Sequence, residues 1–192
     1  MKYVKMLALS TFATAALVAF TGAASATITS PNGTLYTGDV HSTSANTTLH
    51  WVFGTTTCTN TTKTVTVSNG RTRGPVVTYD VGGCGTEGSS NDTIAVIKGG
   101  EEEINSEGKV ISTGLEFTIQ VHRTIFGFPV TTHCIFATNN TLIGTLTQGE
   151  KPEIHAASAP IPQKATDGGC GSESLIMTGS YTVNTPKPIF IP

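Results

Sequence analysis

The sequence predicts a single antiparallel β-sandwich, immunoglobulin-like or jelly-roll-like, with about 8–11 short strands and two disulfides. Three observations carry this prediction. Apolar and polar residues alternate with a period of two along much of the chain, as in strands that bury one face. Turn residues interrupt the alternation at short intervals, and four cysteines are spread along the chain.

The clearest predicted strand covers residues 115–122, where four apolar residues alternate with four polar ones. This pattern indicates a strand with one face in the core and the other in water. The other predicted strands are shorter or less regular, and they cover residues 34–40, 49–53, 64–68, 77–81, 93–98, 110–113, 134–138, 142–147 and 175–183.

Turn signals separate these strands. Asn69-Gly70 and Gly99-Gly100 predict short turns, and Glu107-Gly108 predicts a hairpin. No segment has the 3.6-residue apolar period of a helix. Residues 150–169 contain three prolines, so we expect a long loop there.

The first 26 residues have the three parts of a secretory signal peptide. Lys2 and Lys5 give a positive start, an apolar run of about 15 residues follows, and Ala24-Ser25-Ala26 forms a small-residue cleavage site. The apolar run is shorter than the roughly 20 residues of a membrane span. We therefore expect residues 27–192 to form one exported domain, secreted to the extracellular space, the cell surface or the periplasm.

The charge of the predicted mature chain argues against nucleic acid as a partner. Without Lys2 and Lys5, 9 basic side chains face 13 acidic ones, and the basic residues are not clustered. The basic footprint of a nucleic-acid-binding protein is therefore absent, and so is a polybasic membrane patch. No later segment approaches a transmembrane span.

The four cysteines, Cys58, Cys84, Cys134 and Cys170, predict two disulfides, because an even number in an exported chain is typical of a disulfide framework. Three pairings are possible, and we favour Cys58–Cys84 and Cys134–Cys170. A zinc site would need close pairs such as Cys-x-x-Cys, and the chain has none.

No catalytic, cofactor-binding or metal site is predicted. His122 and His133 could meet across a hairpin, but no third ligand has suitable spacing. Residues 101–103 are three consecutive glutamates, which we interpret as a solvated turn that protects a strand edge. Glu116 has no assignable partner carboxylate, which glycosidase chemistry requires. We therefore expect a protein that is not an enzyme.

Phe126 and Phe128, in the sequence Ile-Phe-Gly-Phe-Pro, form the best candidate apolar contact patch. The same residues could also form a buried turn. Trp51, the single tryptophan, lies in an alternating apolar segment, and we assign it to the core rather than to a carbohydrate platform.

Several segments together resemble a family. A signal peptide, four spaced cysteines, the segment Cys134-Ile135-Phe136, the strand over 141–147 and the C-terminal strand over 178–186 are similar to small secreted bacterial proteins of the alkane-oxidation-activator (PraB-like) type. The resemblance implies a secreted or surface-associated protein linked to hydrophobic substrates or biofilm. It implies no catalytic residues.

Our first functional hypothesis is a non-enzymatic extracellular protein that works by surface or matrix association. Open strand edges would accept other chains or further copies, and residues 27–40 and 187–192 are candidate donor segments. The alternative hypothesis is an extracellular binding module for carbohydrate or apolar small molecules.

Overall fold

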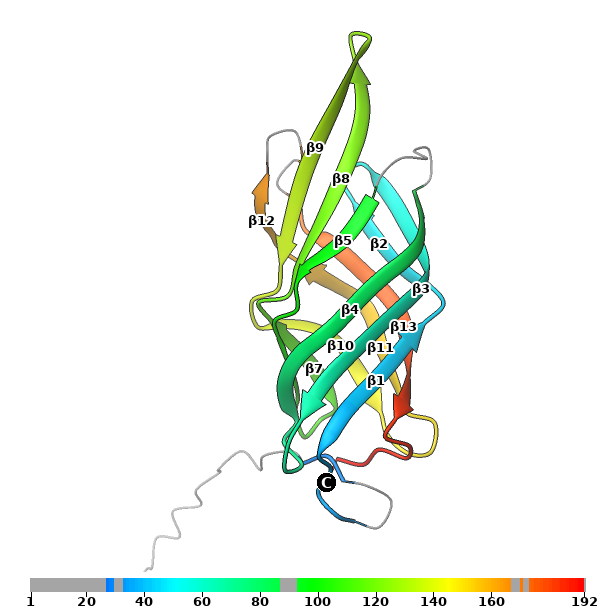
Figure 1. The fold of residues 1–192 in the computed structure, drawn as a ribbon, viewed down its shortest axis with the longest axis vertical. Helices are drawn as coiled ribbons and strands as arrows, with labels where there is room; N and C mark the ends of the chain where they lie inside the picture. Colours follow the sequence, from blue (N-terminus) through cyan, green and yellow to red (C-terminus); the bar gives the residue numbers. More distant parts are fainter. Residues whose placement is uncertain (1–26, 30–32, 87–92, 167–169, 171–172, 192) are drawn as a thin grey trace, which may run out of the picture.

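The computed structural model describes residues 27–29, 33–86, 93–166, 170 and 173–191. The predicted signal peptide lies outside these residues. The described chain is all-β, as predicted (Figure 1). It has thirteen strands: β1 Gly38–Ser44, β2 Thr47–Trp51, β3 Gly54–Val67, β4 Arg73–Thr86, β5 Thr93–Lys98, β6 Glu101–Ile104, β7 Lys109–Thr113, β8 Glu116–Ile125, β9 Phe128–Ala137, β10 Thr141–Thr147, β11 Glu153–Ile161, β12 Gln163–Thr166 and β13 Leu175–Thr185.

The main sheet is a closed barrel of eight antiparallel strands, so the predicted sandwich is wrong. The order around the ring is β1-β13-β11-β10-β7-β6-β4-β3, and β1 closes it by pairing with both β3 and β13. Strand β2 continues the line of β1 and pairs with the same two neighbours. Both architectures show the same alternation of apolar and polar residues, so the period alone could not separate them.

The strands that curl the sheet are long and interrupted by bulges. Strands β3 and β4 have 14 residues each, and the register shifts at Thr64/Val65 in β3 and at Ala156/Ala159 in β11. A bulge increases local twist and bends the strand. In β11 the shift is also visible in burial, because two consecutive exposed residues separate the buried Ala156 and Ala159.

A second sheet, β12-β9-β8-β5, stands above one side of the barrel (Figure 1). Its strand order repeats that of the barrel strands below it, β11-β10-β7-β6, with which it is joined in sequence. Each of these four barrel strands is thus separated from its continuation in the upper sheet by a short interruption at the same height. The inner face of the upper sheet joins the same core as the barrel, and the Phe117 ring meets the Tyr79 ring edge-on at 5.6 Å.

Gly99 and Gly100 make one of these breaks, between β5 and β6. A Cβ on Gly99 would come within 2.2 Å of the Val76 carbonyl oxygen, and Gly100 has a left-handed φ of 68°. Glycine is the residue that tolerates both demands. The dipeptide predicted to form a short turn thus forms a kink, at which the chain passes from one sheet to the other.

Residues 153–166 were expected to lie in a loop, but they form β11 and β12. The prolines avoid the hydrogen bonds that the strands need: Pro152 precedes β11, Pro162 separates β11 from β12, and Pro160 follows the bulge. The Pro152 carbonyl accepts a hydrogen bond from the Val183 N–H, and that of Pro162 from the Ala137 N–H. Proline at strand starts and bulges is compatible with a sheet.

Residues near both ends of the described part of the chain pair at the base of the barrel. Thr29 bridges both Leu35 and Phe190, and Gly149 bridges Ile189. Ile28 and Ile189 are buried there. The predicted strand over 34–40 is displaced, because β1 begins only at Gly38. The segments proposed as donors for another chain are thus engaged within their own molecule.

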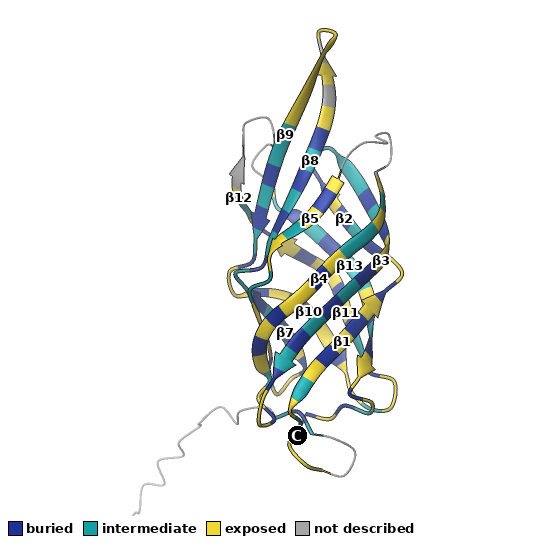
Figure 2. Ribbon diagram, viewed as in Figure 1, coloured by how far each residue is buried: buried dark blue, intermediate teal, exposed yellow. Residues whose placement is uncertain are grey.

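Burial alternates along the barrel strands, and one continuous core fills the barrel and the space beneath the upper sheet (Figure 2). Trp51 belongs to this core at 3% exposure. The predicted pairing of the cysteines is confirmed: Cys58 is bonded to Cys84, its register partner on β4, and Cys134 to Cys170. Two disulfides are typical of proteins from an oxidising compartment.

Candidate functional site

The β8–β9 hairpin extends beyond the rest of the molecule (Figure 1). Its ten residue pairs run from Glu116–Ala137 to Ile125–Phe128. The lower pairs are flanked by β5, which ends its pairing with β8 at Gln120, and by β12, which pairs with β9 up to Cys134. Above this level the described hairpin strands pair with each other. We call residues 122–131 the finger.

The finger ends in a two-residue turn of an unusual composition. Ile125 pairs with Phe128, and the loop residues Phe126 and Gly127 both have left-handed backbones, with φ of 52° and 85°. Two positive φ values define a type I′ turn, for which Asn-Gly or Gly-Gly is strongly preferred. A left-handed conformation costs a residue with a large side chain about 1–2 kcal/mol. The fold of the hairpin therefore gives no reason for a phenylalanine at this position.

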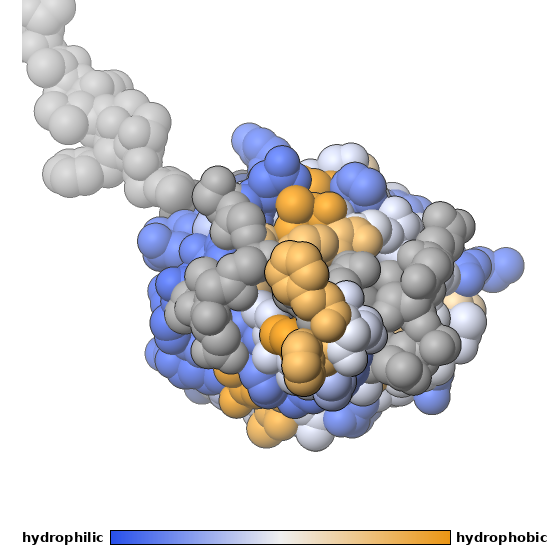
Figure 3. All heavy atoms as spheres, turned by 90° about the horizontal axis from the view of Figure 1, so that it is seen from above, coloured by the Kyte–Doolittle hydropathy of each residue, from blue (hydrophilic) through white to orange (hydrophobic). Residues whose placement is uncertain are grey.

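Apolar side chains gather at this tip. Phe126 is 97% exposed, Phe128 72% and Val130 38%, and Pro129 is also exposed. The view onto this end of the molecule shows a group of hydrophobic atoms in the middle of the coloured surface, next to hydrophilic atoms (Figure 3). Single exposed apolar residues are common on proteins, but a cluster at one protruding point is typical of an interaction site.

The finger also differs from the rest of the chain in charge. Residues 117–149 contain no Asp or Glu, and they contain Arg123, His122 and His133. His122 lies opposite Thr131 in register, with 3.1 Å between its Nδ1 and the Thr131 hydroxyl, and His133 lies opposite Gln120. In the described chain no three His, Cys, Asp or Glu side chains are grouped as metal ligands.

The base of the finger is held on three sides. Glu116 on β8 accepts a hydrogen bond of 2.6 Å from Lys164 on β12, and Lys98 on β5 lies 3.8 Å away. The hydrogen bond from Lys164 lowers the pKa of Glu116. Cys134 on β9 is fully buried in its disulfide to Cys170. The finger thus projects from a platform that is cross-linked covalently and electrostatically.

A second unusual cluster lies inside the barrel. Lys63 donates to both Glu102 oxygens, at 2.9 and 2.7 Å, and both side chains are only 4% exposed. Glu102 was predicted to lie in a solvated turn, and this is wrong: residues 101–103 form β6, which alternates between the interior and solvent. The sequence could not show this alternation, because residues 101–103 are all glutamates and an inward-facing one has the same side chain as its outward-facing neighbours.

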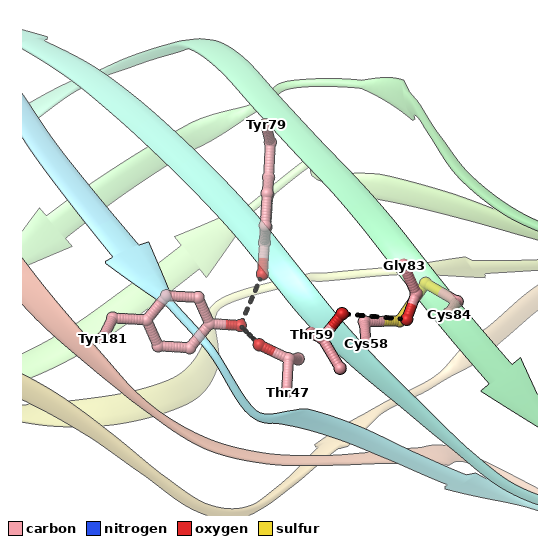
Figure 4. The surroundings of a disulfide bond; sticks show 7 residues. All are labelled: Thr47, Cys58, Thr59, Tyr79, Gly83, Cys84 and Tyr181. Atoms are coloured by element: carbon pink, nitrogen blue, oxygen red, sulfur yellow. Dashed lines mark hydrogen bonds between the residues drawn. A yellow bond between two sulfur atoms is a disulfide. The ribbon is translucent and has the colours of Figure 1, made fainter.

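Two tyrosines complete the interior cluster. The Tyr79 and Tyr181 hydroxyls are 2.9 Å apart, and Thr47 donates to the Tyr181 oxygen at 3.1 Å (Figure 4). Burial raises the pKa of Tyr79 well above its ordinary value and also raises that of Tyr181. The polar groups therefore satisfy one another.

The interior offers little room for a ligand. The enclosed cavity that the described residues form beside Lys63 has a volume of about 20 Å³, which is enough for about one water. Carbohydrate and drug-sized ligands occupy pockets of roughly 300–1,000 Å³. The groove at the base is larger, at about 910 Å³, but it is open to solvent and its charged residues Arg73 and Glu101 pair with each other at 2.6 Å. The finger is therefore the stronger candidate site.

The sequence identified Phe126 and Phe128 as a contact patch, and both side chains lie at the tip of the finger. Pro129 and Val130 were missed as members of the patch. The signal for them was present, since they continue the apolar run that begins at Ile125. Self-association through strand edges stays a prediction, and the closed barrel leaves β5 and β12 of the upper sheet for it.

The chain matches no known family model, and neither the curated proteins nor the solved structures contain a significant match. Within the described residues, no helix has the length and apolarity needed to cross a membrane.

Proposed function

We propose that this chain is a non-enzymatic extracellular or cell-surface protein that attaches to apolar surfaces through its finger. The observation that carries the proposal is Phe126, which is 97% exposed in a left-handed turn position. Neither its exposure nor its backbone conformation stabilises the isolated molecule. Strained residues that persist in a fold often serve a function.

The energy available at the tip is sufficient for attachment. Burying one phenylalanine side chain contributes about 1.5–3 kcal/mol. Phe126 and Phe128 together therefore supply about 3–6 kcal/mol, which corresponds to a factor of more than about 100 in affinity. The ordered platform beneath them reduces the entropy lost on binding.

The resemblance to small secreted proteins of the alkane-oxidation-activator type supports the same direction, since it implies a link to hydrophobic substrates or biofilm. The predicted signal peptide and the two disulfides support an extracellular location.

The test compares adsorption of the mature protein to hexadecane droplets and to polystyrene beads. We expect Phe126→Ser with Phe128→Ser to lower the partition coefficient on hexadecane droplets, which can surround the rings, more than about 100-fold. We expect a smaller loss of adsorption on the rigid polystyrene beads. Val77→Thr and Leu142→Thr serve as matched controls, because these side chains are 57% and 46% exposed on barrel strands β4 and β10. If the control variants lose as much adsorption as the finger variant, attachment is not made by the finger.

A further inference from the structure

The partner of the finger must provide its own cavity, because the tip is convex. Phe126 and Phe128 protrude, and a Cβ built on Gly127 between them meets no atom within 4 Å. A rigid flat surface would touch only the ends of the rings. A fluid apolar phase can surround them, and it recovers their full burial.

The finger changes from apolar residues at its tip to polar residues along its strands, as expected of an element that enters the interface between a lipid bilayer and water. The apolar residues at the tip are followed on β9 by Thr131 and Thr132, and on β8 by Thr124 and His122. The four residue pairs between His122–Thr131 and the turn span about 10–14 Å at the usual rise of a strand. Amphipathic interfacial helices bury their apolar face about 5–10 Å into the boundary between lipid headgroups and acyl chains, and the finger is long enough to reach a similar depth.

The charge of the finger favours one kind of headgroup. Residues 117–149 have a net charge of one positive unit from Arg123, whereas the predicted mature chain is acidic overall. Arg123 lies opposite Val130 in register, between the apolar tip and His122. The nearest acidic residue in sequence is Glu116 at the base, and Lys164 and Lys98 are paired with it.

From these observations we propose that the finger inserts into lipid bilayers that carry anionic headgroups. Phe126 and Phe128 reach the acyl boundary, and Arg123 lies at headgroup depth. This inference rests on the proposed function and deepens it by naming the surface. Attraction to an anionic leaflet acts within about one Debye length of the surface, so it acts on Arg123 in the inserted finger more than on charges that stay farther from the leaflet.

The experiment measures binding of the mature protein to vesicles of phosphatidylcholine alone and of phosphatidylcholine with an equal amount of phosphatidylglycerol. Trp51 is in the core at 3% exposure, so it does not report on the tip. Phe126→Trp places a reporter there, and we expect a blue-shifted emission and quenching by brominated acyl chains. Co-sedimentation of the unmodified protein gives the partition coefficient without a reporter.

We expect anionic vesicles to bind the protein at least about fivefold more strongly than neutral ones, and Arg123→Gln to remove most of that difference. Phe126→Asn is expected to weaken binding to both vesicles at least about tenfold, whereas Val77→Thr leaves both unchanged. Raising the salt from 0.1 to 1 M shortens the Debye length from about 10 to about 3 Å and is expected to abolish the preference.

Adsorption to hexadecane droplets without binding to either vesicle would overturn this inference and leave the proposed function intact. Equal binding to both vesicles would also overturn it, because the preference for anionic headgroups would be absent. Failure on droplets, beads and vesicles alike would overturn the proposed function as well.

Discussion

Lys63 and Glu102 are 4% exposed inside the barrel, whereas Phe126 and Phe128 are 97% and 72% exposed at the finger. Both regions reverse the usual distribution of charged and apolar side chains. Inside the barrel, the reversal is compensated within the chain, since the two charges bind each other and the Lys63 ammonium lies over the rings of Tyr79 and Tyr181, at 5.8 and 5.5 Å from their centroids. At the finger, no described residue covers the rings. Apolar rings that gain no compensating contacts within the chain indicate a partner outside the molecule.

The largest expected effect comes from breaking the compensation inside the barrel. Glu102→Gln leaves the Lys63 ammonium buried without a carboxylate, and we expect a loss of about 3–5 kcal/mol in the free energy of unfolding. Urea denaturation measures it. The double variant Lys63→Met with Glu102→Leu removes both charges, and its free energy of unfolding is expected to lie within about 1 kcal/mol of that of the natural chain. A loss as large as that of the single variant would contradict the view that the two charges only compensate each other. A single variant as stable as the natural chain would show that Lys63 finds another partner.

The disulfide at the base of the finger comes next. It closes a loop of 36 residues between Cys134 and Cys170, so the variant with serine at both positions is expected to lose about 3–4 kcal/mol. Hydrogen exchange should accelerate in β8 and β9 more than in β1 and β3. Uniform acceleration throughout the chain would contradict a special role in supporting the finger.

High pH tests the two tyrosines. Because burial raises the pKa of both hydroxyls above the ordinary value of 10.0, the unfolded chain releases their protons first as the pH rises. Stability is therefore fully present below about pH 10 and falls above it. The free energy of unfolding at a series of pH values should show this decline. Tyr79→Phe with Tyr181→Phe is expected to flatten it, and an unchanged decline in that variant would assign the effect to other groups.

The smallest expected effect is a gain. Phe126→Asn relieves the left-handed conformation of a bulky residue, so we expect the free energy of unfolding to rise by about 1 kcal/mol. Thermal and urea unfolding of the variant measure the change, and Val77→Thr provides the surface control. A loss of stability would mean that Phe126 packs within the monomer, and it would remove the main support for the finger as a binding element.

Much of the fold was predictable because local rules agree with the final structure. The alternation over residues 115–122 predicted the lower part of β8, and residues 93–98 were predicted with the bounds of β5. Both disulfides were paired as expected. Phe126 and Phe128 stood out as an apolar patch in a turn-like sequence. In each case the signal lies within a few neighbouring residues or in the number of cysteines.

Other features depended on contacts between distant segments. Glu102 is buried because Lys63, 39 residues earlier, meets it inside the barrel. Residues 153–166 form strands because β13 and β9 supply partners at positions that avoid the prolines.

The amino-acid sequence by itself determined the β class, the even number of cysteines and the apolar character of residues 125–130, because periodicity, cysteine number and side-chain chemistry are local properties. It favoured one of three possible cysteine pairings, and the structure selected that one. Only the tertiary structure decided that β1 pairs with β3 and β13 to close a barrel, and that the apolar turn stands outside it. Closure and exposure depend on register, bulges and the order of strands in space, which are set by the sum of many weak contacts across the whole chain.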